Sequence, residues 1–436
     1  KAFRSALKVM KEMFREFKSL GRSAVAALEA SPGEIGIVLF GRPYNALSKM
    51  GNKGIPHKFA SRGYRTIPCD FLDFEYQDDP EHVYWGAGEI IIKAAKLVSS
   101  HPSLYGAFIT NFSCGPDSFI VDFFRKEMGR KPSLTLELDN HTADVGLDTR
   151  IEAFVDVIKS YMEIMGNQEP VIDAEFRPAT TRVRGSKIEI IDSEGKVHKL
   201  NDPRVHVLIP SMLDNCSNAS AAVLRRQGNR ASALPDPGEE EFQIGLGYTS
   251  GKECLPVAIT TGSLLKYLRE RKDPDELLVY FVPGDSGPCR FGSYYVLMQN
   301  IIEKLHIPNV AFLSLSQEDG YMGLGTAATL RLWQIFVITD VLEEIYATLL
   351  VVAADREKAI NTYQSAVDRV IAAIEHQRWP GLVLELENCA HTLAGIERKY
   401  EQGEKPVVSL INEMYVRRSN FARKHIVEKL ADKDII

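Results

Sequence analysis

The feature that most constrains the fold is an alternation of short, continuously apolar runs with longer stretches of helical periodicity. Strands that are buried on both faces appear as continuous apolar runs, and their alternation with helices is typical of parallel sheets. The pattern begins near Gly33 and restarts near Val205. We therefore predict an α/β protein with two tandem Rossmann-like or flavodoxin-like parallel-sheet domains. The expected strands are 35–40, 64–68, 106–111, 134–138, 205–210, 277–282, 310–315 and 407–411.

The domain organisation follows from where this pattern stops and restarts. Residues 1–32 are predicted to form an amphipathic helix, because apolar residues recur there at intervals of four and three. We expect a first α/β domain over 33–200, closed by a polar hairpin divider at 186–200. A second α/β domain over 201–436 carries a long helical insertion at about 326–400, where Gly and Pro are absent up to Trp379. A final helix is predicted to run through Leu430.

Composition excludes several classes of protein. A chain with 45% hydrophobic residues is not disordered, and a net charge of −6 offers no basic field for nucleic acid or an anionic membrane. No secretory signal and no membrane-spanning run are visible, so a cytoplasmic protein is expected. The chain starts with Lys1 and stops at Ile436 just after a helical segment, and we expect both ends to be cut from something longer.

Six cysteines are too few for a disulfide scaffold, and reduced thiols are expected. Cys114, Cys254 and Cys289 lie in turns marked by Gly and Pro, and Cys114 and Cys289 follow predicted strands. Ligands of open parallel sheets bind at the carboxyl ends of the strands. No C-x-x-C pair is present. From the residues alone, both a shared metal site and simple packing stay open for these three thiols.

The remaining cysteines are predicted to have other roles. Cys389 lies on the apolar face of a helical segment, and Cys216 lies near a helix start, so both are expected to pack in the core. Cys69 follows the second predicted strand and is an outside candidate for a metal ligand.

Polar residues after two strands are candidates for a pocket. Arg42, Tyr44 and Asn45 follow the first strand and are candidate substrate-binding residues, while Glu137 and His141 follow the fourth and are candidate catalytic residues. The alternative is that these side chains only brace their loops.

The cysteine turns belong to a set of recognisable blocks. These are Gly-Arg-Pro-Tyr-Asn at 41–45, Asn-Phe-Ser-Cys-Gly-Pro-Asp-Ser-Phe at 111–119, Leu-Glu-Leu-Asp-Asn-His-Thr-Ala-Asp at 136–144, Thr-Ser-Gly-Lys-Glu-Cys-Leu-Pro at 249–256, Gly-Pro-Cys-Arg-Phe-Gly at 287–292 and Tyr-Val-Arg-Arg at 415–418. From about residue 33 to the end, the chain resembles the 2-hydroxyacyl-CoA dehydratase-like region of large CoA-enzyme-activase fusion proteins. That region belongs to the benzoyl-CoA reductase and double-cubane cluster protein superfamily.

The resemblance implies a 4Fe–4S cluster held by Cys114, Cys254 and Cys289, with the fourth iron position open. It implies a component of an ATP-driven, low-potential system of anaerobic metabolism, acting as an iron–sulfur oxidoreductase or a 2-hydroxyacyl-CoA dehydratase-like lyase. An activase ATPase domain, fused or separate, would donate the electron and carry the ATP, which agrees with the absence of a P-loop here. A small-molecule or acyl-CoA substrate and a dimeric state are expected.

Three alternatives to this interpretation stay open. A double-cubane 8Fe–9S cluster would need more thiolates, for which Cys69 and Cys216 are the available residues. A non-catalytic electron-transfer or scaffold module would hold a fully ligated cluster or none, and Cys69 as a fourth thiolate would favour it. A zinc site is the weaker possibility, since three scattered cysteines without histidine are unusual for zinc.

Overall fold

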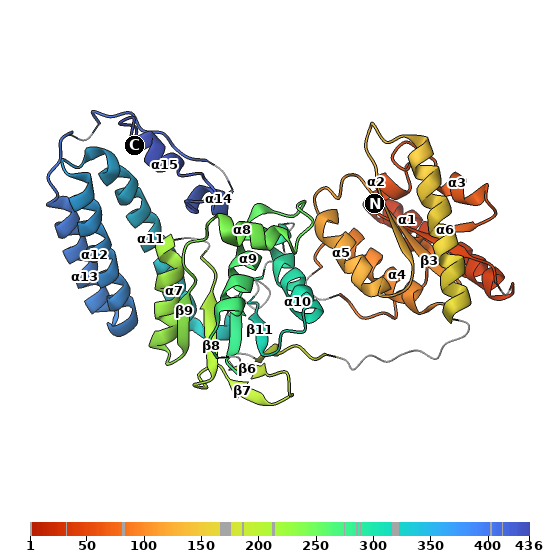
Figure 1. Cartoon of the computed structure of the whole chain (residues 1–436), viewed down its shortest axis with the longest axis horizontal. Helices are drawn as coiled ribbons and strands as arrows, with labels where there is room; N and C mark the ends of the chain where they lie inside the picture. Colours follow the sequence, from red (N-terminus) through yellow and green to blue (C-terminus); the bar gives the residue numbers. More distant parts are fainter. Residues whose placement is uncertain are drawn as a thin grey trace. The chain divides into compact units, whose positions relative to one another are not determined.

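The fold was analysed in a computed structural model, whose contacts group the chain into two compact units. The first unit comprises Lys1–Glu175 with Ser286–Ser293, and the second comprises Phe176–Asp285 with Tyr294–Ile436 (Figure 1). The structure describes residues 2–31, 33–80, 83–165, 176–184, 187–211, 214–273, 275–284, 287, 289–315, 322–401, 403–411 and 413–436.

The first unit is built on a four-stranded parallel sheet with the order β2-β1-β3-β4. The four strands lie where the apolar runs predicted them, to within two residues. The strands are β1 (Gly36–Phe40), β2 (Arg65–Pro68), β3 (Leu104–Thr110) and β4 (Ser133–Glu137). The helices are α1 (Ala2–Glu29), α2 (Pro43–Ala46), α3 (Ile55–Ala60), α4 (Gly86–Ser100), α5 (Asp117–Met128) and α6 (Asp144–Met165), with short 3-10 helices η1 (Cys69–Phe71) and η2 (Arg290–Ser293).

Helices cover both faces of this sheet, which is why β1 and β3 in its centre are buried at every position. One face packs against α3 and α6 in a single buried cluster. On the other face, the ring of Phe124 from α5 lies 4.7 Å from that of Phe40 and 5.3 Å from that of Phe108. Gly106 lets α5 approach, since a Cβ there would lie 2.8 Å from Cζ of Phe124.

Helix α1 is anchored only by its C-terminal half. Phe17 stacks on Phe71 with ring centroids 4.5 Å apart, and Nζ of Lys18 lies 2.8 Å from Oε1 of Glu75. The N-terminal half projects apolar side chains into solvent, with Phe3 78% exposed.

The second unit repeats the parallel sheet and adds helices. Its sheet has the order β11-β10-β8-β9, with all pairs parallel, and a separate antiparallel sheet has the order β5-β6-β7. The strands are β5 (Thr180–Arg184), β6 (Lys187–Ile191), β7 (Val197–Lys199), β8 (Val205–Ile209), β9 (Arg230–Ala233), β10 (Leu277–Phe281) and β11 (Val310–Leu313). The helices are α7 (Asp214–Arg226), α8 (Glu239–Leu246), α9 (Leu255–Glu270), α10 (Tyr294–Lys304), α11 (Thr326–Val352), α12 (Arg356–His376), α13 (Trp379–Ala394), α14 (Met414–Arg418) and α15 (Ile426–Ala431), with η3 (Met322–Leu324).

The two parallel sheets share one strand order. Taken in chain order, each places its second strand at one edge, followed by its first, third and fourth. In this arrangement the loops after the first and third strands meet at the point where the order reverses, which is the usual ligand-binding edge of such sheets. The predicted fold class is therefore confirmed as α/β with two parallel sheets.

The predicted strand at 407–411 is wrong. Residues 406–411 form no strand in the structure, and Val407 and Ile411 are exposed. The segment pairs only with the chain end: the amide of Val408 donates to the carbonyl of Ile436 at 2.7 Å. The fourth place in the sheet belongs instead to β9. Likewise, the predicted final helix is divided into the short helices α14 and α15.

The antiparallel sheet that was predicted as a divider packs on the second unit. Oγ1 of Thr181 donates to the carbonyl of Phe312 at 2.6 Å, and the amide of Asn309 donates to Oγ of Ser193 at 2.9 Å. The hairpin therefore contacts the second sheet, and the domain boundary at residue 200 stays a prediction.

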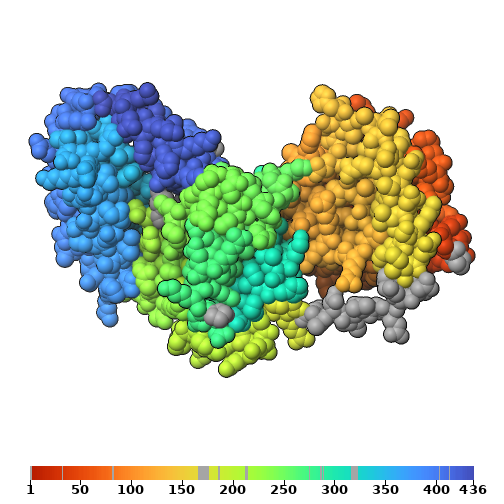
Figure 2. Space-filling view, in the orientation of Figure 1, coloured from red at the N-terminus to blue at the C-terminus, as the bar shows by residue number. Residues whose placement is uncertain are grey.

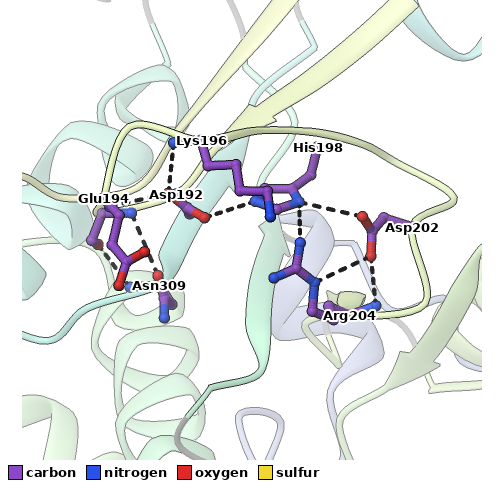
Figure 3. Close-up of polar contacts among 8 residues, drawn as sticks. Asp192, Glu194, Lys196, His198, Asp202, Arg204 and Asn309 are labelled. Carbon is purple, nitrogen blue, oxygen red and sulfur yellow. Dashed lines mark hydrogen bonds and ion pairs between the residues drawn. The ribbon is translucent and has the colours of Figure 1, made fainter.

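A buried histidine braces this antiparallel sheet (Figure 3). Nε2 of His198 lies 2.7 Å from Oδ2 of Asp192, and Nη2 of Arg204 lies 2.7 Å from Nδ1 of His198. Because the guanidinium can only donate, Nδ1 accepts and Nε2–H donates to Asp192. Asp202 joins the network through Arg204, whose backbone amide donates to Oδ1 of Asp202 at 2.9 Å.

Helices α11, α12 and α13 form the predicted helical elaboration. The C-terminal segment, dark blue in Figure 2, lies against α11, where Leu350, Val351 and Ala431 share a small apolar cluster. Among the described helices, none has the length and apolarity needed to cross a bilayer.

Candidate functional site

The turn after β3 presents Cys114 to solvent. Phe112, Ser113 and Gly115 all have left-handed backbones, with φ of 53°, 51° and 63°. The amide of Cys114 donates to the carbonyl of Asn111 at 3.0 Å, which closes the turn. A tight turn of this kind directs the thiol outward, and Cys114 is exposed.

Arg42, from the loop after β1, holds this turn in place. Its Nη2 donates to the carbonyl of Cys114 at 2.7 Å, and its Nε lies 2.9 Å from Oδ1 of Asp117. Asp117 begins α5 and is fully buried, and its Oδ2 accepts from Oγ1 of Thr110 at 2.6 Å. Burial raises the pKa of Asp117, although Thr110 and Arg42 both oppose the shift. One buried ion pair thus joins the first strand's loop to the third's.

The turn of Cys289 lies beside the turn of Cys114 in the first unit. Nη1 of Arg290 lies 3.3 Å from Oγ of Ser118 and 3.5 Å from the carbonyl of Gly115. Cys289 itself is exposed. The residue after one cysteine therefore contacts the residue after the other, and both turns have an arginine as their brace.

Cys254 belongs to the second unit and precedes helix α9 directly. Its backbone is extended, with φ −64° and ψ 140°, and it is half-buried. The preceding turn is tied by Glu253, whose Oε1 accepts from the amide and hydroxyl of Ser250 at 3.1 and 2.9 Å. Like Cys114 and Cys289, this thiol lies in an irregular segment outside the core.

The other three cysteines are buried. Burial raises the pKa of Cys69 to about 12, and it also raises the pKa values of Cys216 and Cys389. Cys216 and Cys389 therefore pack in the core, as predicted. The six thiols divide into three accessible ones, all in recognisable blocks, and three buried ones.

The predicted pocket residues after β1 also differ in their exposure to solvent. Tyr44 is exposed, and the guanidinium carbon of Arg42 lies 4.8 Å from the centre of its ring. Asn45 is buried, and its Nδ2 has no hydrogen-bond partner among the described residues. Arg42 and Tyr44 thus flank the Cys114 turn, whereas Asn45 lies beneath the surface.

Of the two candidates after β4, only Glu137 reaches the Cys114 turn. Its Oε1 accepts from Oγ of Ser113 at 2.9 Å. His141 is exposed, and its amide donates to Oδ1 of Asp139 at 3.0 Å. The contacts of the described residues bring nothing from the cysteine turns to the His141 ring.

Two residues of the site were missed by sequence reasoning. Asp117 lies in the same block as Cys114, and Arg290 directly follows Cys289. Asp117 could have been predicted as a residue of the site, since it begins a helix three residues after Cys114. The partner of each residue is far away in the sequence, so only the structure reveals the pairing.

The donors suit an iron–sulfur cluster in chemistry, because three accessible thiols are the ligands such clusters use. In the part of the chain that the structure describes, however, no three His, Cys, Asp or Glu side chains form a group able to hold a metal ion. Two of the thiols belong to the first unit and the third to the second.

Comparison with known proteins gives one match. Residues 1–72 match the family model described as "CoA enzyme activase uncharacterised domain", which extends from α1 to η1 and includes Arg42, Tyr44 and Asn45. No curated protein and no solved structure matches the chain. Because the match covers 72 of 436 residues, it identifies a region and not the whole chain. The chain therefore carries a region associated with CoA enzyme activases.

Proposed function

We propose that this chain is the iron–sulfur component of an ATP-driven, low-potential reductase or dehydratase system. The observation that carries the proposal is the division of the thiols. Of the three in recognisable blocks, Cys114 and Cys289 are exposed and Cys254 is half-buried, whereas the other three are buried. Packing alone gives no reason for accessibility to coincide with these blocks, whereas cluster ligation requires it.

In this proposal the three accessible thiols bind a 4Fe–4S cluster and leave one iron open to substrate. When bound, such a cluster supplies one-electron reduction at low potential. The chain's own contribution is electrostatic and geometric. Arg42 and Arg290 place positive charge beside the turns of Cys114 and Cys289, which would stabilise an anionic cluster.

A single cubane is preferred over a double cubane because the extra thiolates are missing. Cys69 and Cys216 are buried, and their raised pKa values disfavour the thiolate form that ligation needs. The same burial argues against Cys69 as a fourth ligand, and so against a fully ligated electron-transfer module.

The partner and substrate follow from the matched region and the open iron. The activase-associated region over residues 1–72 supports an activase ATPase, fused or separate, as the electron donor and as the place where ATP is bound. The substrate is a small molecule or an acyl-CoA that approaches the open iron. Glu137 is the better placed proton donor or acceptor, since it contacts the turn of Cys114 through Ser113.

The test is anaerobic purification and reconstitution, followed by iron and sulfide assays and by absorption and EPR spectra before and after reduction. Cys114→Ala, Cys254→Ala and Cys289→Ala should each lose the cluster, while the matched control Cys389→Ala should keep it. A chain that stays colourless and free of iron after reconstitution would refute the proposal.

A second measurement separates the open site from a closed one. If one iron is open, adding cyanide to the reduced protein should change its EPR spectrum, and Cys69→Ala should leave that response intact. A spectrum that cyanide leaves unchanged, together with loss of the cluster in Cys69→Ala, would instead identify a fully ligated electron-transfer module.

A further inference from the structure

A large groove lies within the second unit. It has a volume of about 1200 Å³ and is bounded by α11, α13 and the segment from Arg398 to the chain end. Ligand pockets commonly measure about 300–1,000 Å³. The groove is therefore large enough to hold a chain-like molecule along its length.

The groove has a buried apolar floor and an exposed apolar rim. Leu349, Val352 and Leu393 form part of the floor and are buried. Val341 and Val408 also line the groove and are about half exposed. Exposed aliphatic side chains that surround one groove are a common sign of a binding surface, because a ligand that covers them removes apolar surface from water, which is favourable.

One arginine of the groove lacks an acceptor. Arg417 belongs to the Tyr-Val-Arg-Arg block, for which the proposed cluster chemistry has no use. Its Nε is buried without a hydrogen-bond partner, and no ion pair of its side chain occurs among the described residues. A buried guanidinium donor without an acceptor is costly unless an anion supplies one.

The neighbouring arginines differ from Arg417, because each of them has a carboxylate partner. Arg418 pairs with Asp340, and Nη2 of Arg423 lies 3.5 Å from Oε1 of Glu428. Nη1 of Arg423 also donates to the carbonyl of Arg417 at 3.4 Å, so the residues are close. Two of the three arginines have carboxylate partners of their own, and the third does not.

The acidic residues that line the groove do not neutralise the positive charge of Arg417. Glu344 and Glu401 line it but are exposed to solvent, and Glu343 has an interaction of its own. Of the two other lining cations, Lys405 lies 3.2 Å from Asp434, and Arg398 is exposed to solvent. Among the described lining cations, Arg417 therefore combines a buried Nε that has no hydrogen-bond partner with the lack of a carboxylate partner.

We propose that the groove binds a single-chain amphipathic anion, whose alkyl chain lies on the apolar floor and whose carboxylate or phosphate pairs with Arg417. A purely apolar ligand would leave the guanidinium unsatisfied, and a small inorganic anion would leave the floor in water. The head group is common to free acyl carboxylates and to alkyl phosphates, and the experiment below distinguishes them.

The test is calorimetric titration of the full chain with four ligands that share a ten-carbon chain: decanoate, decyl phosphate, decanol and decyltrimethylammonium. We expect one site for decanoate or decyl phosphate, and the anion that binds more tightly identifies the head group. The alcohol and the cation should bind at least tenfold more weakly. Arg417→Gln should weaken binding of the anions by about ten- to a hundredfold, as expected for loss of a charge-assisted hydrogen bond, while decanol binding stays unchanged.

Two matched controls make the result specific. Arg378→Gln removes an exposed arginine of the same helical region that does not line the groove, and it should leave binding unchanged. Val408→Glu keeps Arg417 but places a carboxylate on the rim, and it should also abolish binding of the anions. This second variant decides the matter if Arg417→Gln proves unstable on heating.

Three results would overturn the proposal. Decanol that binds as tightly as decanoate would make the groove a non-specific apolar surface, and absence of binding by all four ligands would remove the site. Concentration-dependent dimerisation in sedimentation velocity, abolished by Val408→Glu, would show that a second copy of the chain occupies the groove.

Discussion

The two parallel sheets share a strand order but bury their charges at opposite ends. In the first sheet the buried ion pair, Arg42 with Asp117, lies at the carboxyl ends of the strands. In the second, Glu276 pairs with His206 and Arg230 at the amino ends of β8, β9 and β10, with contacts of 2.9 and 2.7 Å. Ligands of such sheets bind at the carboxyl ends. The first sheet therefore buries its ion pair at the end where ligands of such sheets bind, and the second buries its charges at the opposite end.

The largest expected effect is a difference in thiol reactivity within the first unit. We expect Cys114, which follows β3, to react much faster than Cys69, which follows β2. At a pH below 9, raising the pKa of Cys69 from 9.0 to about 12 lowers its thiolate fraction by about a thousandfold. In the cluster-free protein, Cys114, Cys254 and Cys289 should react quickly with a thiol reagent, and Cys69, Cys216 and Cys389 should react only on unfolding. Mass spectrometry of the labelled peptides measures this, and rapid labelling of Cys69 would contradict the division of the thiols.

The next effect is on the ion pair of the first sheet. Asp117→Ala removes a fully buried carboxylate and leaves Arg42 without its partner, so it should lower the free energy of unfolding by about 3–5 kcal/mol. Urea denaturation followed by circular dichroism measures the change. Asp117→Asn, which keeps the hydrogen bond with Thr110, should cost less, and equal losses in the two variants would mean that charge is not the reason.

The corresponding change in the second sheet should be smaller. Glu276→Gln leaves Arg230 without its carboxylate, but the Arg230 side chain is half exposed and water can solvate it. We expect a loss of about 2 kcal/mol in the same assay. A loss as large as that of Asp117→Ala would remove the energetic difference between the two sheet ends.

The pH dependence of the second sheet should separate its histidine from the acids of the antiparallel sheet. Burial lowers the pKa of His206 below 6.5, although Glu276 opposes the shift. The unfolded chain then binds the proton more readily, so stability is fully present above pH 6.5 and is lost as the pH falls through the folded pKa. Urea midpoints from pH 7.5 to 5 should decline, and His206→Gln should flatten this part of the curve.

The carboxylates around His198 affect stability in a lower pH range than His206 does. Burial raises the pKa of Asp192, but hydrogen bonds from His198 and from backbone amides outweigh it and lower the pKa overall. The pKa of Asp202 is lowered chiefly by the hydrogen bond from the Arg204 amide. Their contribution is present above about pH 4, near the ordinary value of 3.8, and is lost as the pH falls through the folded values. Asp192→Asn should reduce the loss of stability between pH 4 and 2.5, with no change above pH 5.

The smallest effect concerns the carboxyl end of the second sheet, where no ion pair like that of Arg42 is present among the described residues. Oγ of Ser211, which follows β8, donates to Oδ1 of Asp236 at 2.7 Å. Ser211→Ala should cost only about 1 kcal/mol, as expected for one hydrogen bond. A cost near that of Asp117→Ala would indicate that this end is also under electrostatic control.

The sequence predicted those parts of the fold that depend on local pattern. Nine strands were found where expected, namely seven of the predicted apolar runs and the two arms of the predicted hairpin. The strand β9 was missed because Arg230–Ala233 contains no large apolar residue and is stabilised by its neighbour β8. The segment 407–411 was mistaken for a strand because its composition is apolar, but a strand also needs a partner, and pairing is not a local property.

The same limit applies to the site. Cys114, Cys254, Cys289 and Arg42 were identified because they lie in recognisable blocks. Their relation to one another was beyond sequence reasoning, since Arg42 reaches Cys114 across 72 positions and Arg290 reaches Gly115 across 175. Asn45 and His141 lie in the same blocks, yet the structure places one in the interior and leaves the other away from the turn.

The left-handed turn at Phe112 and Ser113 has a consequence for the rate of ligand capture. Non-glycine residues enter this backbone region at a cost of about 1–2 kcal/mol each. The ion pair beneath the turn offsets this strain when the chain folds. A ligand of Cys114 therefore encounters a loop whose conformation is already fixed. Capture then requires little ordering of the chain, and it should be limited by encounter rather than by rearrangement of the loop.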